Sequence, residues 1–512
     1  MIRAAAAFVA VLASFTSVYA LCRWCGAQPQ PAVVAALLAV SLSHRASPAS
    51  RAHAGTATVT IAGIALAAAG VGWLLHTSPA LGALVFTAAM FFSIWLRNFG
   101  ERARSAGALI ALPLVALLVV PAQSAGARGG PLVDLALVAS AGVISLAYVT
   151  VIQSLARRAG IQLFTSVAVE TATPTRPKGI GISSTTRMAL QMAVALTAAF
   201  AVGLSAFPAH SGWTVLTAFI VCSGARGRGD AAYKGVLRLF GALTGTLAAA
   251  ALARLWAPSG VGEAIAIFSV LFFGLWLRDV NYAFWAACMT LILALLARTN
   301  DGLNIALLGV RLEAMLVGAL CAVAAAWFVL PIRTEAVVRR RLADALEALD
   351  DLVAHAHVAD AKQIGRAARF EHRMAELDRV APPVRWHRRI FASAGTAEHP
   401  ARWIELTCEL GDHGRAFASN ASGRERQRAV VRRAIGASRR ALANHGKPDT
   451  AADRLPVSVA LSKLRDTLVT ANTPNVSLKV DRDSAGHQGV CDDTVAGPAR
   501  GDADSEEHGV GR

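Results

Sequence analysis

Charged residues are scarce in this 512-residue chain: they make up 16% of it, compared with roughly 25% in soluble proteins. Apolar residues make up 55%, and before Pro331 they form a series of runs separated by short polar loops. Each run is long enough, or nearly so, to cross about 30 Å of hydrocarbon. The composition therefore excludes an ordinary soluble protein and indicates a polytopic protein of the lipid bilayer.

The motifs of common enzyme classes are also missing. Residues 224–229 are rich in glycine, but no strand precedes them and no Gly-Lys-Ser/Thr ending follows, so they do not fit a nucleotide-binding loop. The chain has no nucleophile triad and no zinc-ligand spacing. We therefore predict that it is not an enzyme, that it needs no cofactor and that it holds no metal.

Cysteine is sparse, with seven residues scattered along the chain. Cys22 and Cys25 have the C-x-x-C spacing of a redox motif or of half a zinc site. They have no second cysteine pair and no thioredoxin-like context, which favours a structural or incidental role. A periplasmic disulfide is the alternative that the sequence leaves open.

Charge divides the chain near residue 332. Residues 1–332 contain 21 Lys/Arg and 8 Asp/Glu, and the remainder contains 29 and 25. The basic excess thus lies in membrane loops, where it sets topology rather than binding nucleic acid. We expect a first transmembrane repeat at 1–155, a cytoplasmic linker at 156–186, a second transmembrane repeat at 187–331, a cytoplasmic helical domain at 332–472 and a disordered tail at 473–512.

The two halves of the membrane part resemble each other. Residues 91–98 (FFSIWLRN) match 272–279 (FFGLWLRD) at an offset of 181, and the same offset superimposes the short apolar runs 32–43 and 213–224. The sequence therefore predicts an all-α bundle of about twelve transmembrane helices in two parallel six-helix repeats. The expected helices are 4–22, 29–43, 56–76, 79–96, 105–121, 132–155, 187–207, 212–223, 234–256, 261–277, 281–298 and 304–330.

The first of these runs also fits a signal peptide, because Arg3 precedes it and Val18-Tyr19-Ala20 resembles a cleavage site. The corresponding helix of the second half favours an uncleaved first helix. With Met1 inside, the inner loops and helix ends hold 16 Lys/Arg and the outer ones 5. Since basic residues stay on the cytoplasmic side, we expect both termini in the cytoplasm.

Beyond the membrane part, five apolar residues recur at alternating steps of three and four: Val338, Leu342, Ala345, Leu349 and Leu352. This stripe is typical of an amphipathic or coiled-coil helix, buried either within one chain or in a homo-oligomer. Further helices are expected near 361–380, 400–419, 424–444 and 456–471, with a break at Ala381-Pro382-Pro383.

One stretch resembles a known family. Trp213-x-x-x-Thr217 is followed by a Gly/Arg-rich hinge and by Lys234-Gly235-x-x-Arg238-x-x-Gly241-x-x-x-Gly245. This order is similar to the core of the fusaric acid resistance protein-like (aromatic acid exporter) family, and the resemblance extends over about 187–331. It implies a bacterial inner-membrane exporter of weak, often aromatic, organic acids. The Gly241–Gly245 spacing is a small-xxx-small face that allows close helix approach.

Short apolar segments at equivalent places in two repeats are a sign of a transport site. Free amides at the end of the 213–223 segment, with nearby polar side chains, would suit an anion; the alternative is a short helix with an ordinary basic loop. Arg238, one turn into its helix, either extends to the cytoplasmic interface or pairs with a substrate carboxylate. We expect the substrate to contact Trp213, Thr214, Thr217, Ser223, Arg226, Lys234 and Arg238.

Ionisable residues within the last helix of each repeat are candidates for proton coupling, because charges inside a membrane are costly. Arg311 and Glu313 lie about two turns into the twelfth helix, and Asp134 lies near the outer end of the sixth. Glu313 and Asp134 would carry the proton. Alternatively, both helices begin later and these charges lie among the lipid headgroups.

Together these features predict a proton-coupled secondary transporter; the resemblance alone implies that its substrate is an organic, often aromatic, acid and that the direction is export. An organic-anion channel and a non-transporting scaffold acting through its cytoplasmic helices are the alternatives. The expected partners are a small organic anion and the bilayer, with a homo-oligomer and periplasmic or outer-membrane efflux components left open.

Overall fold

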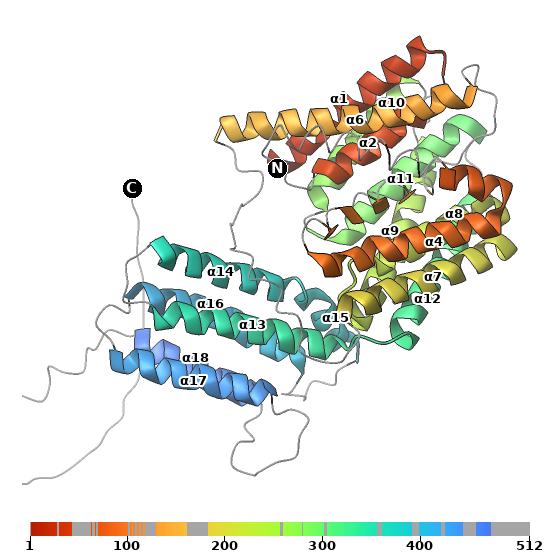
Figure 1. Cartoon of the computed structure of the whole chain (residues 1–512). Coiled ribbons are helices and arrows are strands. Elements are labelled where there is room, and N and C mark those ends of the chain that lie inside the picture. The colour runs from red at the N-terminus through yellow and green to blue at the C-terminus, as the bar shows by residue number, and fades with distance from the viewer. Residues whose placement is uncertain are drawn as a thin grey trace, which may run out of the picture.

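The computed structural model describes residues 2–27, 30–43, 70–100, 130–160, 183–255, 260–278, 280–301, 305–355, 361–391, 399–420, 425–443 and 457–472, with scattered positions between 63 and 118. Every regular element in these parts is a helix, so the expected all-α class is confirmed. Figure 1 shows two bodies: a larger helix bundle, and a smaller one that α13 to α18 form near the C-terminus.

The larger bundle contains ten described α-helices. In the first half they are α1 (Ile2–Trp24), α2 (Gln30–Ser43), α4 (Pro79–Trp95, continued by the 3-10 turn η1 at Leu96–Phe99) and α6 (Gly130–Arg158). In the second half they are α7 (Ser184–Ala206), α8 (Ser211–Cys222, preceded by η2 at Pro208–His210), α9 (Arg228–Leu255), α10 (Val261–Leu277), α11 (Tyr282–Asp301) and α12 (Ile305–Phe328). The helices expected at 56–76 and 105–121 fall largely outside the described residues, as do most of the 156–186 linker and the whole 473–512 tail.

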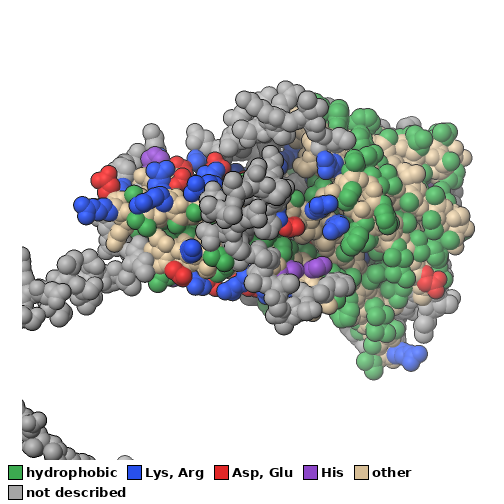
Figure 2. Space-filling view, turned by 90° about the horizontal axis from the view of Figure 1, so that it is seen from below, with side chains coloured by type: hydrophobic (Ala, Val, Ile, Leu, Met, Phe, Trp, Pro, Cys, Tyr) green, Lys and Arg blue, Asp and Glu red, His purple; other side chains and the backbone are tan. Residues whose placement is uncertain are grey.

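Six of the described helices are long and apolar enough to cross a membrane. These spans are Arg3–Trp24, Pro79–Phe99, Ala139–Arg158, Ser184–Ala206, Arg228–Leu252 and Gly309–Phe328. Four shorter apolar helices accompany them, at Pro31–Val40, Ser211–Cys222, Gly262–Leu277 and Tyr282–Leu296. Hydrophobic side chains cover much of this body, whereas blue and red side chains gather on the C-terminal one (Figure 2).

Helix contacts follow the same order in both halves. The helices α1, α2 and α6 pack against one another, and so do α7, α8 and α12. Helices of the two halves also pack against each other across the bundle: α1 packs against α10, and α7 packs against α4. An edge-to-face phenylalanine pair lies in each crossing, Phe15–Phe268 in one (ring centroids 5.2 Å apart) and Phe86–Phe200 in the other (5.5 Å).

The long helix α9 approaches α11 very closely along its glycine face. A Cβ atom added to Gly241 would lie 2.6 Å from both the carbonyl oxygen of Ala283 and the Cβ of Ala286, and one added to Gly245 would collide with the carbonyl of Ala287. The small-xxx-small interpretation is therefore confirmed. Gly235 on the same helix has ordinary space, because its nearest neighbour would be Val323 Cγ2 at 3.5 Å.

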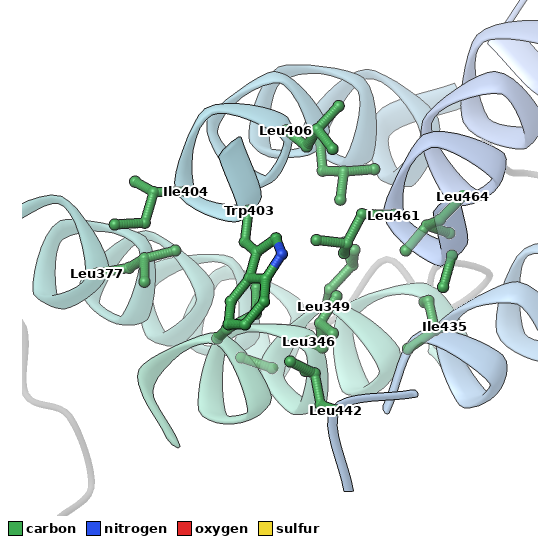
Figure 3. Close-up of a cluster of buried hydrophobic side chains, with 14 of the residues drawn as sticks. Leu346, Leu349, Leu377, Trp403, Ile404, Leu406, Ile435, Leu442, Leu461 and Leu464 are labelled. Carbon is green, nitrogen blue, oxygen red and sulfur yellow. The ribbon is translucent and has the colours of Figure 1, made fainter. Parts of the chain in front are cut away.

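The C-terminal body is a bundle of six helices: α13 (Thr334–Ala354), α14 (Ala361–Asp378), α15 (Ala381–Phe391), α16 (Pro400–Asn420), α17 (Glu425–Ala443) and α18 (Val457–Asn472). Its core surrounds the fully buried Trp403, with leucines and isoleucines from α13, α14, α16, α17 and α18 beside it (Figure 3). The stripe predicted at 338–352 is buried in this core. One chain therefore covers the stripe by itself.

The break expected at Ala381-Pro382-Pro383 lies just before these residues, because α14 ends at Asp378 and the unexpected helix α15 begins at Ala381. Proline lacks an amide hydrogen, but the first amides of a helix have no intrahelical acceptor anyway, and proline's fixed φ suits the first turn. The two prolines start this helix instead of interrupting the chain.

Gly245→Ala should lower the thermal unfolding midpoint of the detergent-purified protein by several degrees, because overpacking costs about 1–3 kcal/mol. Gly235→Ala is the matched control. Both changes gain the same helix propensity, so only packing separates them, and the control should keep or raise the midpoint. Equal midpoints for the two variants would contradict the close α9–α11 approach.

Candidate functional site

Two arginines lie inside the larger bundle. Arg238 on α9 is 3% exposed and Arg311 on α12 is 6% exposed. Arg238 is ten residues along α9, and Arg311 is six residues along α12, so neither lies at a helix end. The snorkelling explanation for Arg238 therefore does not fit its burial. Charges placed this way in a membrane bundle are costly and usually functional.

Arg311 is stacked on an aromatic ring. Its Cζ lies 3.7 Å from the ring centroid of Trp213, at the start of α8, in the geometry of a cation–π contact. Its Nε and Nη2 atoms are buried and have no hydrogen-bond partner. These two nitrogens form one edge of the guanidinium plane, and their hydrogens point the same way, which is the arrangement that binds a carboxylate with two parallel hydrogen bonds. Trp213 thus holds the group while Nε and Nη2 have no hydrogen-bond partner.

Arg238 is held from the opposite side. Its guanidinium donates a hydrogen bond to the hydroxyl of Tyr282, the first residue of α11. Its Nε is buried without an acceptor. Arg238 is also the charged group that acts electrostatically on Arg311. The two guanidinium groups therefore lie within electrostatic range of each other, on α9 and α12, which pack together.

Two hydroxyls of α8 lie in the same part of the bundle. Thr214 and Thr217 are fully buried, and neither hydroxyl has a partner. Buried threonines in helices commonly donate to the carbonyl four residues earlier, as Thr290 does here to Ala286 (2.9 Å). Gly318 allows α12 to approach α8 closely at Thr214, because a Cβ atom on Gly318 would collide with the carbonyl of Thr214. The unused hydroxyls remain available to a ligand.

No carboxylate neutralises the two arginines among the residues that the structure describes. The ion pair found there within the larger bundle joins Lys234 Nζ to Asp230 Oδ2 at 3.4 Å, in the first turns of α9. A buried charge without a counter-ion costs several kcal/mol. Arg238 and Arg311 are therefore buried cations without a described counter-ion.

The remaining predicted substrate residues lie elsewhere, around the start of α9. Lys234 Nζ donates to the carbonyl of Ser223 (3.4 Å), and Asp230 Oδ2 accepts from the backbone amide of Arg226 (3.0 Å). Arg226 Nη1 donates to the carbonyl of Arg379 in the C-terminal bundle (2.8 Å). Partial burial lowers the pKa of Arg226. Ser223, Arg226 and Lys234 thus have structural partners near the start of α9, where Lys234 lies one turn before Arg238.

These residues belong to a joint between the two bodies, formed by residues 223–234 and 329–334. The amide of Arg228 donates to the carbonyl of Ile332 (3.1 Å), and that of Gly229 donates to Thr334 Oγ1 (3.1 Å). At the same joint Leu330 has a left-handed φ of 47°, which costs a non-glycine residue about 1–2 kcal/mol.

Side chains from both bodies complete the joint. Gln191 Nε2 donates to the carbonyls of Val329 (2.9 Å) and Leu330 (3.3 Å), so it holds the strained turn. Tyr233 of α9 contacts Trp386 of α15, with ring centroids 5.7 Å apart. The helices α9 and α12, which carry the two buried arginines, are therefore both tied to the C-terminal bundle.

The acids predicted for proton coupling are not part of this site as described. Glu313 is exposed on the outer surface of α12, together with Leu316 and Leu320. Asp134 lies in α6, but its side chain is outside the described residues. Sequence reasoning missed Glu263, in the first turn of α10, which is 7% exposed and whose Oε1 has no partner.

Arg311 and Tyr282 are the two site residues absent from the predicted set. One signal pointed to Arg311: residues two apart on a helix do not face each other, so Arg311 and Glu313 had to lie on different faces. The sequence did not reveal which face pointed inward. Tyr282 gave no signal, because a tyrosine at a helix start is common at membrane interfaces.

These features define a multi-pass membrane protein with a cationic site inside its second half. Residues 180–325 match a family model described as fusaric acid resistance protein-like, which confirms the resemblance inferred from the motif. Trp213, Thr214, Thr217, Arg238 and Arg311 all lie within the matched residues. Comparisons with curated proteins and with solved structures found no match.

Arg311→Met should not lower the thermal midpoint of the purified protein in buffer without organic anions. Replacing a buried charge with an apolar group of similar size commonly gains about 1–4 kcal/mol, against about 0.5–2 kcal/mol lost from the Trp213 stack. The control Arg254→Met changes an exposed arginine of α9 and should be neutral. A clear loss of stability in Arg311→Met alone would identify Arg311 as a structural residue.

Proposed function

We propose that this chain is an inner-membrane secondary transporter that exports organic anions. One observation carries the proposal. Arg238 and Arg311 are both buried, Arg238 acts electrostatically on Arg311, and neither has a described counter-ion. A structural role would require acids beside them, because uncompensated buried charge destabilises a bundle. An anion that enters and leaves would balance them only while bound. The matched family supports membrane transport rather than enzymatic chemistry, and it is the source of the aromatic-acid expectation.

The proposed architecture is twelve transmembrane helices in two parallel repeats. The matching order of helix contacts in the two halves, including the α1–α10 and α7–α4 crossings, supports this duplication. Transport would then consist of the halves rocking about the arginine site. α8 has 12 residues, about 18 Å at 1.5 Å per residue, and is thus too short to span the membrane alone. It would present Trp213, Thr214 and Thr217 partway across.

For proton coupling we propose a carboxylate that is protonated on the outer side. Glu313 and Asp134 remain candidates from the sequence, and Glu263 joins them because it is buried and its Oε1 has no partner. The joint residues Arg226 and Lys234 belong to a basic inner entrance that would attract anions from the cytoplasm. Both termini and the C-terminal bundle would lie in the cytoplasm.

Arg238→Ala should reduce efflux of radiolabelled aromatic acids from loaded cells by about 10- to 100-fold at matched expression. Hydrogen bonds to charged groups contribute about 1.5–3 kcal/mol, and each 1.4 kcal/mol is a factor of ten. Arg254→Ala is the control and should be silent. Unchanged efflux in Arg238→Ala would remove the arginine site from the transport mechanism.

A protonophore and three acid variants test the coupling separately. Wild-type efflux should fall when the proton gradient is dissipated. Glu263→Gln, Glu313→Gln and Asp134→Asn are compared for efflux and for exchange of labelled against unlabelled acid. The variant of the coupling residue should lose gradient-driven efflux and keep exchange, because exchange needs no net proton movement. Efflux that ignores the protonophore in the wild type would favour the anion channel.

Fusions of alkaline phosphatase and of green fluorescent protein should report the orientation. Attached after the C-terminal residue or after Arg278, the fluorescent protein should be bright and the phosphatase inactive, since both positions are expected to be cytoplasmic. After His210 the pattern should reverse. The same pattern at His210 and at Arg278 would overturn the orientation.

A further inference from the structure

The charge of the site specifies its ligand more closely than the proposed function does. The described residues place two guanidinium groups in the bundle and no acid beside them. We propose that the ligand is a dianion, an organic acid with two carboxylate groups, of which Arg311 binds one and Arg238 the other. This inference rests on the proposed function, since it identifies the class of anion that the same site accepts.

The first argument is charge balance. A monocarboxylate would neutralise one arginine and leave the second as a buried, unpaired cation. Such a cation is strongly unfavourable in a low-dielectric interior. Because Arg238 acts electrostatically on Arg311, the two charges also repel each other in the empty site. Two carboxylates remove both penalties at once.

The second argument is the geometry of the open donors. The Nε and Nη2 atoms of Arg311 are buried without a hydrogen-bond partner, and together they suit a two-bond contact with one carboxylate. The ring of Trp213 lies over the face of this guanidinium, so the contact would form along the Nε–Nη2 edge. Arg238 offers its Nε, because Tyr282 already accepts from its guanidinium. Each arginine thus contacts an aromatic residue and keeps guanidinium nitrogens that have no hydrogen-bond partner.

The hydroxyls of Thr214 and Thr217 add a third set of groups. They are buried and unpaired in the empty site, and each hydroxyl can donate one hydrogen bond to a carboxylate oxygen. They lie three residues apart on α8, so they share a face of that helix. A ligand with four carboxylate oxygens could use them together with both arginines.

The site residues are not repeated at the equivalent sequence positions of the first half. At the offset of 181, Trp213, Thr214, Thr217, Arg238 and Arg311 correspond to Ala32, Val33, Ala36, Ala57 and Gly130. The cationic residues have therefore no counterparts across the internal repeat. One chain would bind one dianion, with the α7–α12 half supplying the groups.

The test is a binding series in which ring size is nearly constant and charge changes. Benzoate, phthalate and terephthalate are titrated into the full-length protein in detergent at neutral pH, with benzamide as the uncharged control, and affinities are measured calorimetrically. At least one dicarboxylate should bind about tenfold more tightly than benzoate, as one added charge-assisted contact predicts. Benzamide should not bind.

Arg311→Gln then distinguishes two charges from one. It should lower the ratio of dicarboxylate affinity to benzoate affinity about tenfold, so that the preference for two carboxylates disappears. Arg311→Lys keeps the charge and should retain part of the preference, and Arg254→Gln should bind as the wild type does. Equal affinity of wild type for benzoate and both dicarboxylates would overturn the proposal, as would an equal loss for all acids in Arg311→Gln.

Two further results would each have a different meaning. Sulfate is a dianion without the length to reach two arginines in the same way, so it should not displace the dicarboxylate at comparable concentration. Displacement by sulfate would assign the site to inorganic dianions and overturn the two-carboxylate form. Absence of binding by every acid would remove the proposed function itself, whereas binding without discrimination would remove only this inference.

Discussion

Repulsion between two buried guanidinium groups is the constraint around which the second half of this protein is arranged. In a medium of low dielectric constant, like charges cannot be screened by water, so the bundle must fix each group against something else. Arg311 is stacked on Trp213, and Arg238 donates to Tyr282. Neither neighbour is an acid. The arrangement keeps both cations in place without a described counter-ion.

Close backbone contacts hold the helices that carry these groups. Gly318 lets α12 meet α8 at Thr214, and Gly241 and Gly245 let α9 meet α11 along two turns. Small residues allow this approach in membranes, where apolar side chains gain little from leaving lipid for protein. Packing thus fixes the relative heights of Arg238, Arg311 and the α8 hydroxyls.

The joint extends this arrangement beyond the bundle. It binds the start of α9, through Arg228 and Gly229, and α7, through Gln191, to the backbone stretch that directly follows α12. Tyr233 and Trp386 add a side-chain contact to the C-terminal helices. A movement of the C-terminal helices would therefore act on both α9 and α12 at the joint. The C-terminal bundle thus contacts α9, one of the two helices that carry the buried arginines.

Much of this protein follows from the order of its residues alone. Runs of apolar residues specify membrane helices, because backbone groups in lipid must bond within the helix, and the glycine spacing on α9 correctly predicted a close contact. Heptad-like spacing located α13, but only the fold showed that its own chain buries the stripe at 338–352. Burial of Arg238 and Arg311 also depended on tertiary structure, since a sequence does not tell which face of an apolar helix meets protein and which meets lipid. The sequence also did not show that Arg226 donates to a backbone carbonyl and that Lys234 pairs with an acid. The candidate site consists of side chains from four helices, which come together only when the helices pack.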